Sequence, residues 1–291
     1  MKAPLLLIAA VASAQEITRT VDVFLNQSLD MSRDRWTSGY LTGYSRGAEP
    51  AVWLYDNAGK QILRDTPIVL PEYSKIDIRS VTASPQGTLF VSAEAWGVGG
   101  GACAVLIRVT PPGKIDRVIS TGRFAARAMT IKDQRLWLFG APLIDGNIRN
   151  ADYTTVRSYD ATSLNLLTDS MPRAQFGTPF VPSSKDPAIV ALPNSILIYD
   201  GSWYELGLDG KEKRRFQTAG PAAWGIVATP QGRVYGAQRG NGVFELDLST
   251  AKWIRKTERV SDFAGLYGHD GESLIYRSGC CTYGWVSLVE R

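Results

Sequence analysis

Histidine and cysteine are scarce in this sequence, and their scarcity excludes several classes of metalloprotein. The 291 residues include one histidine and three cysteines. The chain alone therefore cannot build a multi-histidine zinc or iron centre, a Cys₄ zinc site or a four-cysteine iron–sulfur cluster. It also lacks the phosphate-loop motif G-x-x-x-x-G-K-[ST] and a Rossmann fingerprint.

Neither a large charge imbalance nor a long apolar run is present. The chain has 32 basic and 28 acidic residues, a formal net charge of +4, and the two signs are interspersed, which argues against a nucleic-acid partner. The densest basic run, residues 211–215, follows a glycine turn and is predicted to be a solvated outer strand. No segment reaches the ~20 apolar residues that cross a bilayer, so we expect no membrane span.

The first fourteen residues have the three parts of a secretory signal peptide. Lys2 is followed by the apolar run 5–11, and Ala12-Ser13-Ala14 ends the segment with small residues. This order is typical of a cleaved signal, although a buried N-terminal strand is the alternative interpretation. We therefore expect residues 1–14 to be removed and the mature protein to be periplasmic or secreted.

The sequence is rich in short β-branched or aromatic runs that are bounded by turn residues. No long stretch keeps a 3.6-residue period, which predicts an all-β fold. One unit recurs: a strand, a tight turn and an aromatic–aliphatic strand. Its copies are residues 81–91, 128–138, 189–198, 226–235 and 266–275.

A second unit alternates with the first and consists of an aliphatic strand, a polar turn that often ends in Gly-Lys, and another strand. Its copies are residues 52–60, 106–114, 156–163, 204–211 and 244–250. Each pair of units supplies four antiparallel strands, the content of one propeller blade, and the spacing of roughly 40–60 residues fits that interpretation.

The repeats predict that residues 15–291 are a single β-propeller domain. A weaker unit at residues 39–44 brings the expected number of four-stranded blades to six, and one misread repeat would make it five or seven. Residues 17–25 are expected to pair with the C-terminal strands and close the ring, which removes the exposed sheet edges.

Two turn sequences, Ser84-Pro85-Gln86-Gly87 and residues 109–114, resemble the blade signature of six-bladed propellers of the NHL and SMP-30/gluconolactonase-like superfamily. The resemblance extends over most of the mature chain and is architectural, because such turns recur in many propellers. It implies the fold but no activity.

The longer loops are expected to gather on one face of the propeller, the long-loop face. This face carries the loops between the second and third strands of each blade and the connections between blades. Side chains at the channel mouth on this face are predicted to bind an anionic or planar ligand, the arginines by bidentate contacts. The candidates are Arg79, Arg127, Asp186, Trp224 and Arg239. Internal salt bridges, such as Arg127 with Asp186, are the alternative.

The lactonase-like relatives hold a divalent metal, typically calcium, at this mouth through acidic and amide side chains. Their ligand set is not matched residue for residue in this chain. Glu94, Asp186 and Asn241 lie nearest by loop position, and oxygen donors of this kind suit calcium, although the arginines nearby argue against it.

The cysteines leave three possibilities open in an oxidising compartment. Adjacent Cys280 and Cys281 form a vicinal disulfide, one of them pairs with Cys103, or the thiols stay free. The vicinal bond is favoured because Cys103 is expected to lie two blades away, beyond the reach of a disulfide. The lone His269 is expected in a tight turn on the opposite face, with no nucleophile beside it.

Together these observations favour an exported, non-catalytic propeller that binds a small molecule or a protein partner on its long-loop face, without a cofactor. The alternative is a calcium-dependent hydrolase of the lactonase or esterase type at the channel mouth. The sequence alone does not decide whether the chain is an enzyme.

Overall fold

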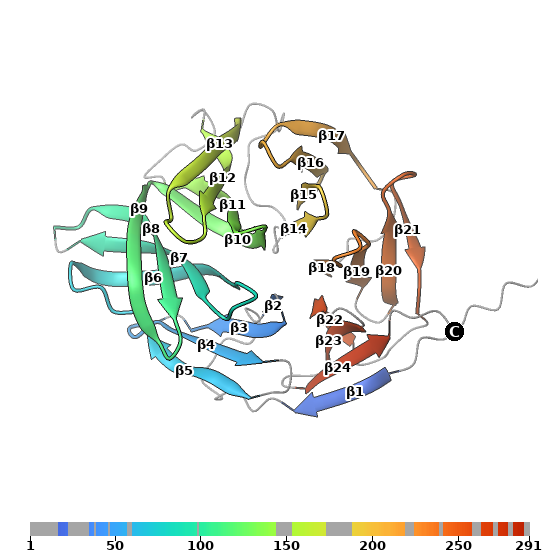
Figure 1. Cartoon of the computed structure of the whole chain (residues 1–291), viewed down its shortest axis with the longest axis horizontal. Helices are drawn as coiled ribbons and strands as arrows, with labels where there is room; N and C mark the ends of the chain where they lie inside the picture. Colours follow the sequence, from blue (N-terminus) through green and yellow to red (C-terminus); the bar gives the residue numbers. More distant parts are fainter. Residues whose placement is uncertain are drawn as a thin grey trace, which may run out of the picture.

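The computed structural model describes residues 17–22, 35–37, 39–45, 47–56, 60–97, 99–143, 153–172, 188–218, 224–238, 241–257, 263–269, 273–278 and 282–287. Within these residues the chain forms 24 β-strands and no helix. The strands are arranged as a ring of antiparallel sheets (Figure 1). The predicted all-β propeller class is therefore confirmed.

Five of the sheets are built from four consecutive strands each. The first contains β2 (Arg35–Thr37), β3 (Tyr40–Tyr44), β4 (Ala51–Asp56) and β5 (Gln61–Pro67). The second contains β6 (Tyr73–Ala83), β7 (Leu89–Gly97), β8 (Ala102–Thr110) and β9 (Lys114–Gly122). The third contains β10 (Phe124–Lys132), β11 (Arg135–Pro142), β12 (Thr154–Asp160) and β13 (Leu166–Pro172).

The other two follow the same order along the chain. The fourth contains β14 (Ala188–Leu192), β15 (Ser195–Tyr199), β16 (Trp203–Gly207) and β17 (Glu212–Phe216). The fifth contains β18 (Trp224–Ala228), β19 (Val234–Gln238), β20 (Gly242–Asp247) and β21 (Lys252–Arg255).

A further four-stranded sheet joins the two ends of the described chain. It contains β22 (Phe263–His269), β23 (Ser273–Ser278), β24 (Thr282–Ser287) and β1 (Ile17–Asp22). Strand β1 pairs antiparallel with β24, with Val21 opposite Tyr283. The predicted closing strand is therefore confirmed over Ile17–Asp22.

The first strand of each sheet faces the centre of the ring. Neighbouring first strands contact one another in the order β2, β6, β10, β14, β18 and β22, and β22 contacts β2 again. Figure 1 shows β2, β10, β14, β18 and β22 around the middle and β5, β13, β17 and β21 at the periphery. Side chains on the first two strands of a sheet are thus placed to meet those of the next sheet.

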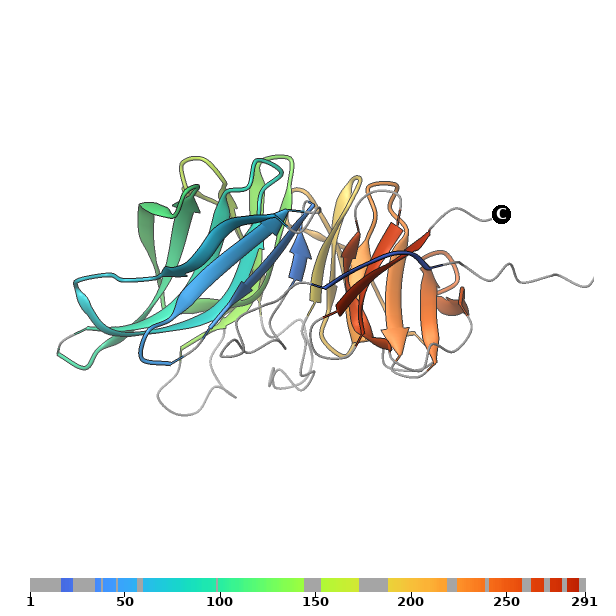
Figure 2. The ribbon, with the colours of Figure 1, turned by 90° about the horizontal axis from the view of Figure 1, so that it is seen from below.

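The strands run between two faces of a flat disc, as the edge-on view shows (Figure 2). Because all pairings within the sheets are antiparallel, the first-to-second and third-to-fourth turns lie on one face, the tight-turn face. The second-to-third loops and the connections between sheets lie on the long-loop face.

Buried tryptophans fill the sheets, as expected from strands that pack blade on blade. Trp53, Trp137 and Trp203 are among the largest fully buried side chains of the described chain. Gly43 makes room for one of them, because a Cβ at Gly43 would lie 2.4 Å from the Trp53 ring. A side chain at position 43 would therefore displace a core residue.

The prediction for the basic run is confirmed. Its residues lie on an outer strand, since β17 is the last strand of its sheet and residues 212–215 are exposed. In the glycine-rich stretch 97–101, strand β7 extends to Gly97, which pairs with Tyr73 on β6. Among the described residues no helix is long and apolar enough to cross a membrane.

Candidate functional site

Arg79 lies at a β-bulge in β6, the strand that faces the centre of the ring. The pairing with β7 shifts between Ile78 and Ser80, so Arg79 has no partner in the register. A bulge re-aims the side chain of the extra residue. The backbone carbonyl of Arg79 accepts a hydrogen bond of 2.9 Å from the Tyr44 hydroxyl on β3, in the neighbouring sheet.

Arg127 occupies the same kind of position on the next blade. The pairing of β10 with β11 shifts between Ala126 and Ala128, which leaves Arg127 at the bulge. The backbone N–H of Ala126 donates a 3.0 Å hydrogen bond to the hydroxyl of Ser92, a buried residue on β7. Ser92 therefore fixes the backbone of one blade to that of the next, beside Arg127.

Glu94 on β7 lies between these two arginines. Among the described residues it is the only charged residue that is buried, with 5% of its surface exposed. Its Oε2 is hydrogen-bonded to Nη2 of Arg79, and its Oε1 lies 3.5 Å from Nη2 of Arg127. A buried carboxylate needs such partners because its desolvation is costly.

A second carboxylate completes the cluster on the β6 side. Oδ2 of Asp77 lies 3.1 Å from Nη2 of Arg79, and Asp77 is opposite Glu94 in the register of β6 and β7. The four side chains carry two positive and two negative formal charges. We refer to Asp77, Arg79, Glu94 and Arg127 as the arginine–carboxylate cluster.

The cluster lies toward the long-loop face. Glu94 is near the end of β7 that leads into the second-to-third loop, and Arg127 is near the start of β10, just after the connection from β9. Sequence reasoning placed Arg79 and Arg127 at this face. The structure brings both to one carboxylate, that of Glu94. The alternative salt bridge of Arg127 with Asp186 stays a prediction, because Asp186 lies outside the described residues.

The cluster does not fit the calcium site that the lactonase-like resemblance implies. Calcium takes six to eight oxygen ligands, whereas two guanidinium groups lie against the Glu94 carboxylate. Asn241, a second candidate ligand, lies in the turn immediately before β20, where its backbone carbonyl accepts a hydrogen bond from Arg255. The described residues hold no group of three or more His, Cys, Asp or Glu side chains that suits a metal ion.

Several predicted site residues lie outside the described residues. These are Asp186, Arg239, Cys280 and Cys281. Trp224 is the first residue of β18, a strand that faces the centre of the ring. The ligand-binding roles of these residues remain predictions.

Cys103 carries a free thiol, so the alternative that pairs it with Cys280 or Cys281 is wrong. It lies within β8 and not in a loop. Its Sγ donates to the hydroxyl of Tyr73, with the two atoms 3.5 Å apart. This hydrogen bond, burial and the neighbouring charges raise the pKa of Tyr73 to about 12.

Asp200 was not among the site residues predicted from the sequence. It lies in the loop between β15 and β16 on the long-loop face. Its Oδ1 is buried and has no hydrogen-bond partner among the described residues. Burial raises the pKa of this carboxyl from 3.8 to about 6. The Asp200-Gly201 sequence predicts a hairpin turn and gives no sign that the carboxyl is buried.

Comparisons with known proteins place the chain by its fold. No protein-family model and no curated protein match the sequence. A solved structure, described as "Crystal Structure of Mitotic Checkpoint Complex", contains a chain that matches with a TM-score of 0.52 at 11% identity. The match covers 100% of this chain and 97% of the other.

A computationally designed protein, Ika8, also matches, at 10% identity and a TM-score of 0.43, over 87% of this chain and 70% of the other. The first of these matches, at 11% identity and a TM-score of 0.52, shows a shared fold and says nothing of activity. The class that fold and comparison define is a β-propeller.

Proposed function

We propose that this chain is an exported, non-catalytic β-propeller that binds an anionic ligand on its long-loop face. The arginine–carboxylate cluster carries the proposal. Two arginines from neighbouring blades meet there, and both side chains are partly exposed, 19% for Arg79 and 32% for Arg127. Arginine recognises carboxylates and phosphates through paired N–H donors.

The same cluster weakens the hydrolase alternative. A calcium ion at Glu94 would have to compete with two guanidinium groups for one carboxylate, and like charges oppose its approach. The blade signature at residues 84–87 still favours the NHL and gluconolactonase-like group among propellers. We infer that a protein of this group retains the scaffold without the metal.

Export is the second part of the proposal, and it rests on the signal-like residues 1–14. Its test is expression of the full chain followed by fractionation and N-terminal sequencing. The expected result is a mature N-terminus at Gln15 in the periplasm or medium. Recovery of the uncleaved chain inside the cell would contradict export and leave the binding proposal intact.

The binding test is isothermal titration calorimetry of the full protein with three anions: benzoate, citrate and inorganic phosphate. We expect at least one to bind, and Arg127→Gln to weaken that binding at least tenfold. Arg117→Gln is the matched control, since Arg117 is an exposed arginine on the outer strand β9. Equal binding by both variants, or no binding of any anion, overturns the proposal.

A calcium titration followed by thermal unfolding tests the alternative directly. A rise of several degrees that is lost in both Glu94→Ala and Asp186→Ala would favour the metal-dependent hydrolase. An unchanged unfolding temperature agrees with the binding protein.

A further inference from the structure

We propose that the two arginines of the cluster have different roles, an inference that rests on the proposed function and deepens it. Arg127 contacts the ligand, which we assign to the class of small monocarboxylates. Arg79 holds Glu94 in place, and the Glu94 carboxylate competes with the ligand for Arg127. Glu94 therefore sets the affinity of the site.

Arg79 is held on several sides. Its Nη2 contacts both Asp77 and Glu94, and its backbone carbonyl is bound by Tyr44 of the neighbouring sheet. Its Nε is buried. A guanidinium with two carboxylates on one nitrogen gains little from a third anion, so Arg79 acts as a positioning residue.

Arg127 is held less tightly to Glu94. The distance of 3.5 Å between its Nη2 and Glu94 Oε1 is an ion pair beyond ordinary hydrogen-bond length. Glu94 Oε1 accepts no hydrogen bond among the described residues, although Glu94 is more than nine-tenths buried. The Arg127 side chain is also the more exposed of the two arginines. An entering anion would thus meet Arg127 first.

The charge balance of the cluster selects the ligand class. The formal charges of its two positive and two negative groups sum to zero, so an entering anion is repelled by Glu94 and Asp77 as well as attracted by the arginines. A monocarboxylate adds one negative charge, in the planar form that Glu94 already presents to the arginines. A phosphate adds ≈ 1.5 to 2 negative charges at neutral pH and meets correspondingly more repulsion.

The experiment measures the dissociation constant of benzoate, a monocarboxylate probe, by calorimetry at fixed ionic strength. Benzamide is its neutral isostere and should not bind. We expect Glu94→Gln to bind benzoate about tenfold more tightly than the unmodified protein, because the competing charge is gone while the side-chain volume is kept. Arg127→Gln in the Glu94→Gln background should abolish the gain.

Glu205→Gln is the matched control. Glu205 on β16 also pairs with an arginine, Arg214, through a 2.6 Å contact, but this pair lies in a different sheet from the cluster. Its loss should leave the benzoate affinity within twofold of the unmodified protein. A gain in this control would show a general charge effect and overturn the assignment to Glu94.

Glu94→Asp keeps the proposal testable if the glutamine variant does not fold. The shorter side chain withdraws the carboxylate from Arg127 and keeps its charge, so a smaller gain in benzoate affinity is expected.

Unchanged or weaker benzoate binding in the folded Glu94 variants overturns the role of Glu94 as a competitor. Arg127-dependent binding in the unmodified protein would still support the proposed function. Tighter binding of inorganic phosphate than of benzoate overturns the ligand class, and binding of no anion at all removes the proposed function itself.

Discussion

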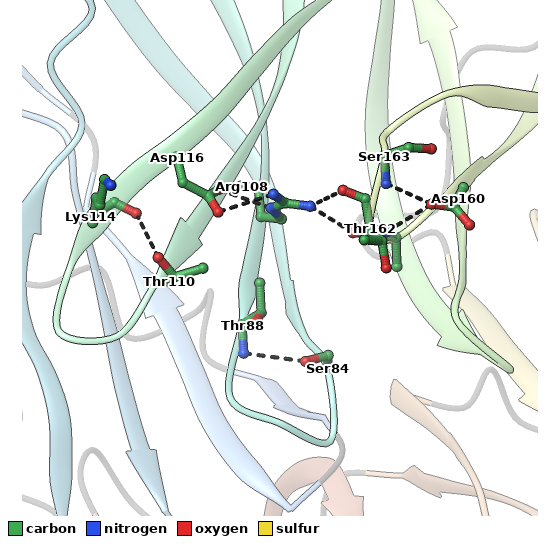
Figure 3. Close-up of polar contacts among 10 residues, drawn as sticks. Ser84, Thr88, Arg108, Thr110, Lys114, Asp116, Asp160, Thr162 and Ser163 are labelled. Atoms are coloured by element: carbon green, nitrogen blue, oxygen red, sulfur yellow. Dashed lines mark hydrogen bonds and ion pairs between the residues drawn. The ribbon is translucent and has the colours of Figure 1, made fainter.

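The guanidinium of Arg108 on β8 donates a hydrogen bond to the backbone carbonyl of Thr162, in the adjacent blade (Figure 3). The same guanidinium forms a two-point contact with Asp116 on β9, at 2.8 and 3.0 Å. The turn that it reaches is organised by Asp160, whose carboxylate accepts hydrogen bonds from the backbone N–H groups of Thr162 and Ser163. A side chain fixed in its own blade thus holds a preformed turn in the next.

The next two blade junctions have the same kind of contact, an arginine of one blade hydrogen-bonded to a backbone carbonyl of the next. Arg135 donates to the carbonyl of Leu208, and Arg214 donates to that of Leu248 at 2.6 Å. Both carbonyls belong to third-to-fourth turns on the tight-turn face. These arginine contacts hold neighbouring blades together on the tight-turn face, whereas the Ser92–Ala126 hydrogen bond joins the second and third sheets toward the long-loop face.

Replacing Arg108 by glutamine should destabilise the protein by about 1–2 kcal/mol, because it removes charge-assisted hydrogen bonds at a partly exposed site. The measurement is the free energy of unfolding in urea. Arg117→Gln is the control, since Arg117 lies opposite Arg108 on β9 and is exposed. The control should stay within about 0.5 kcal/mol of the unmodified protein, and equal losses in the two variants would contradict the clamp.

Gly225 on β18 lies close against β22 of the neighbouring blade, near the centre of the ring. A Cβ at this residue would lie 1.9 Å from the Leu266 carbonyl oxygen on β22, and its φ of +62° is a left-handed conformation. Gly225→Ala should therefore cost more than about 3 kcal/mol or prevent folding, since strain in the backbone adds to the clash.

Gly99→Ala provides the comparison for Gly225→Ala. Nothing lies within 4 Å of a Cβ built on Gly99, so its unfolding temperature should change by less than about 2 °C. A Gly225→Ala protein as stable as the Gly99→Ala protein would show that β18 and β22 can separate at little cost.

The turns and short strands of the sequence predicted much of the fold. The Pro-Gly turn at residues 84–87 and the Gly-Lys turn at 113–114 do connect neighbouring strands of one sheet. Pro and Gly fix local backbone angles, so a local pattern is enough to locate such turns. The ends of longer strands were less predictable. Strand β7 continues to Gly97 because this glycine pairs with Tyr73 on β6, a contact that the local sequence does not indicate.

The candidate site was predictable only in part, for a related reason. Arg79 and Arg127 were predicted to lie at the channel mouth, but both lie at β-bulges, which no local sequence pattern indicated. Glu94 was recognised as a possible metal ligand from its position near a loop. Its pairing with two arginines depends on the contact between β7 and β10, which only the assembled ring provides.

Ser92→Ala should weaken both stability and ligand binding. It leaves the buried N–H of Ala126 without its acceptor, at a cost of about 1–3 kcal/mol, and it releases the backbone beside Arg127. Calorimetry with benzoate should show a weaker affinity by about threefold or more. Ser84→Ala is the control, because the Ser84 hydroxyl accepts hydrogen bonds within a turn on the tight-turn face. It should lower stability and leave the affinity unchanged, and a similar loss of affinity in both variants would refute the positioning role of Ser92.

The contribution of Asp200 to the free energy of unfolding should decrease as the pH rises from about 4 to 7. Burial raises its pKa in the folded protein from 3.8 to about 6, so the folded state holds a proton that the unfolded state has already released. The stabilisation of the folded state by that proton is present in full below pH 3.8 and is lost as the pH passes through 6. Asp200→Asn removes the penalty of a buried charge and should be more stable than the unmodified protein by about 1–2 kcal/mol at pH 8, with no difference near pH 3.5.

The comparison variant for Asp200→Asn is Asp247→Asn, because hydrogen bonds from Ser249 and Thr250 lower the pKa of Asp247. A carboxylate with a lowered pKa stabilises the folded state above its unfolded pKa, and this contribution is lost as the pH falls through the folded value. Asp247→Asn should therefore be less stable than the unmodified protein at pH 8, and the difference should shrink in acid. Unfolding temperatures measured at half-unit pH intervals check both signs. If Asp200→Asn loses stability at pH 8 as Asp247→Asn does, the Asp200 carboxylate is stabilised by a partner and not penalised by burial.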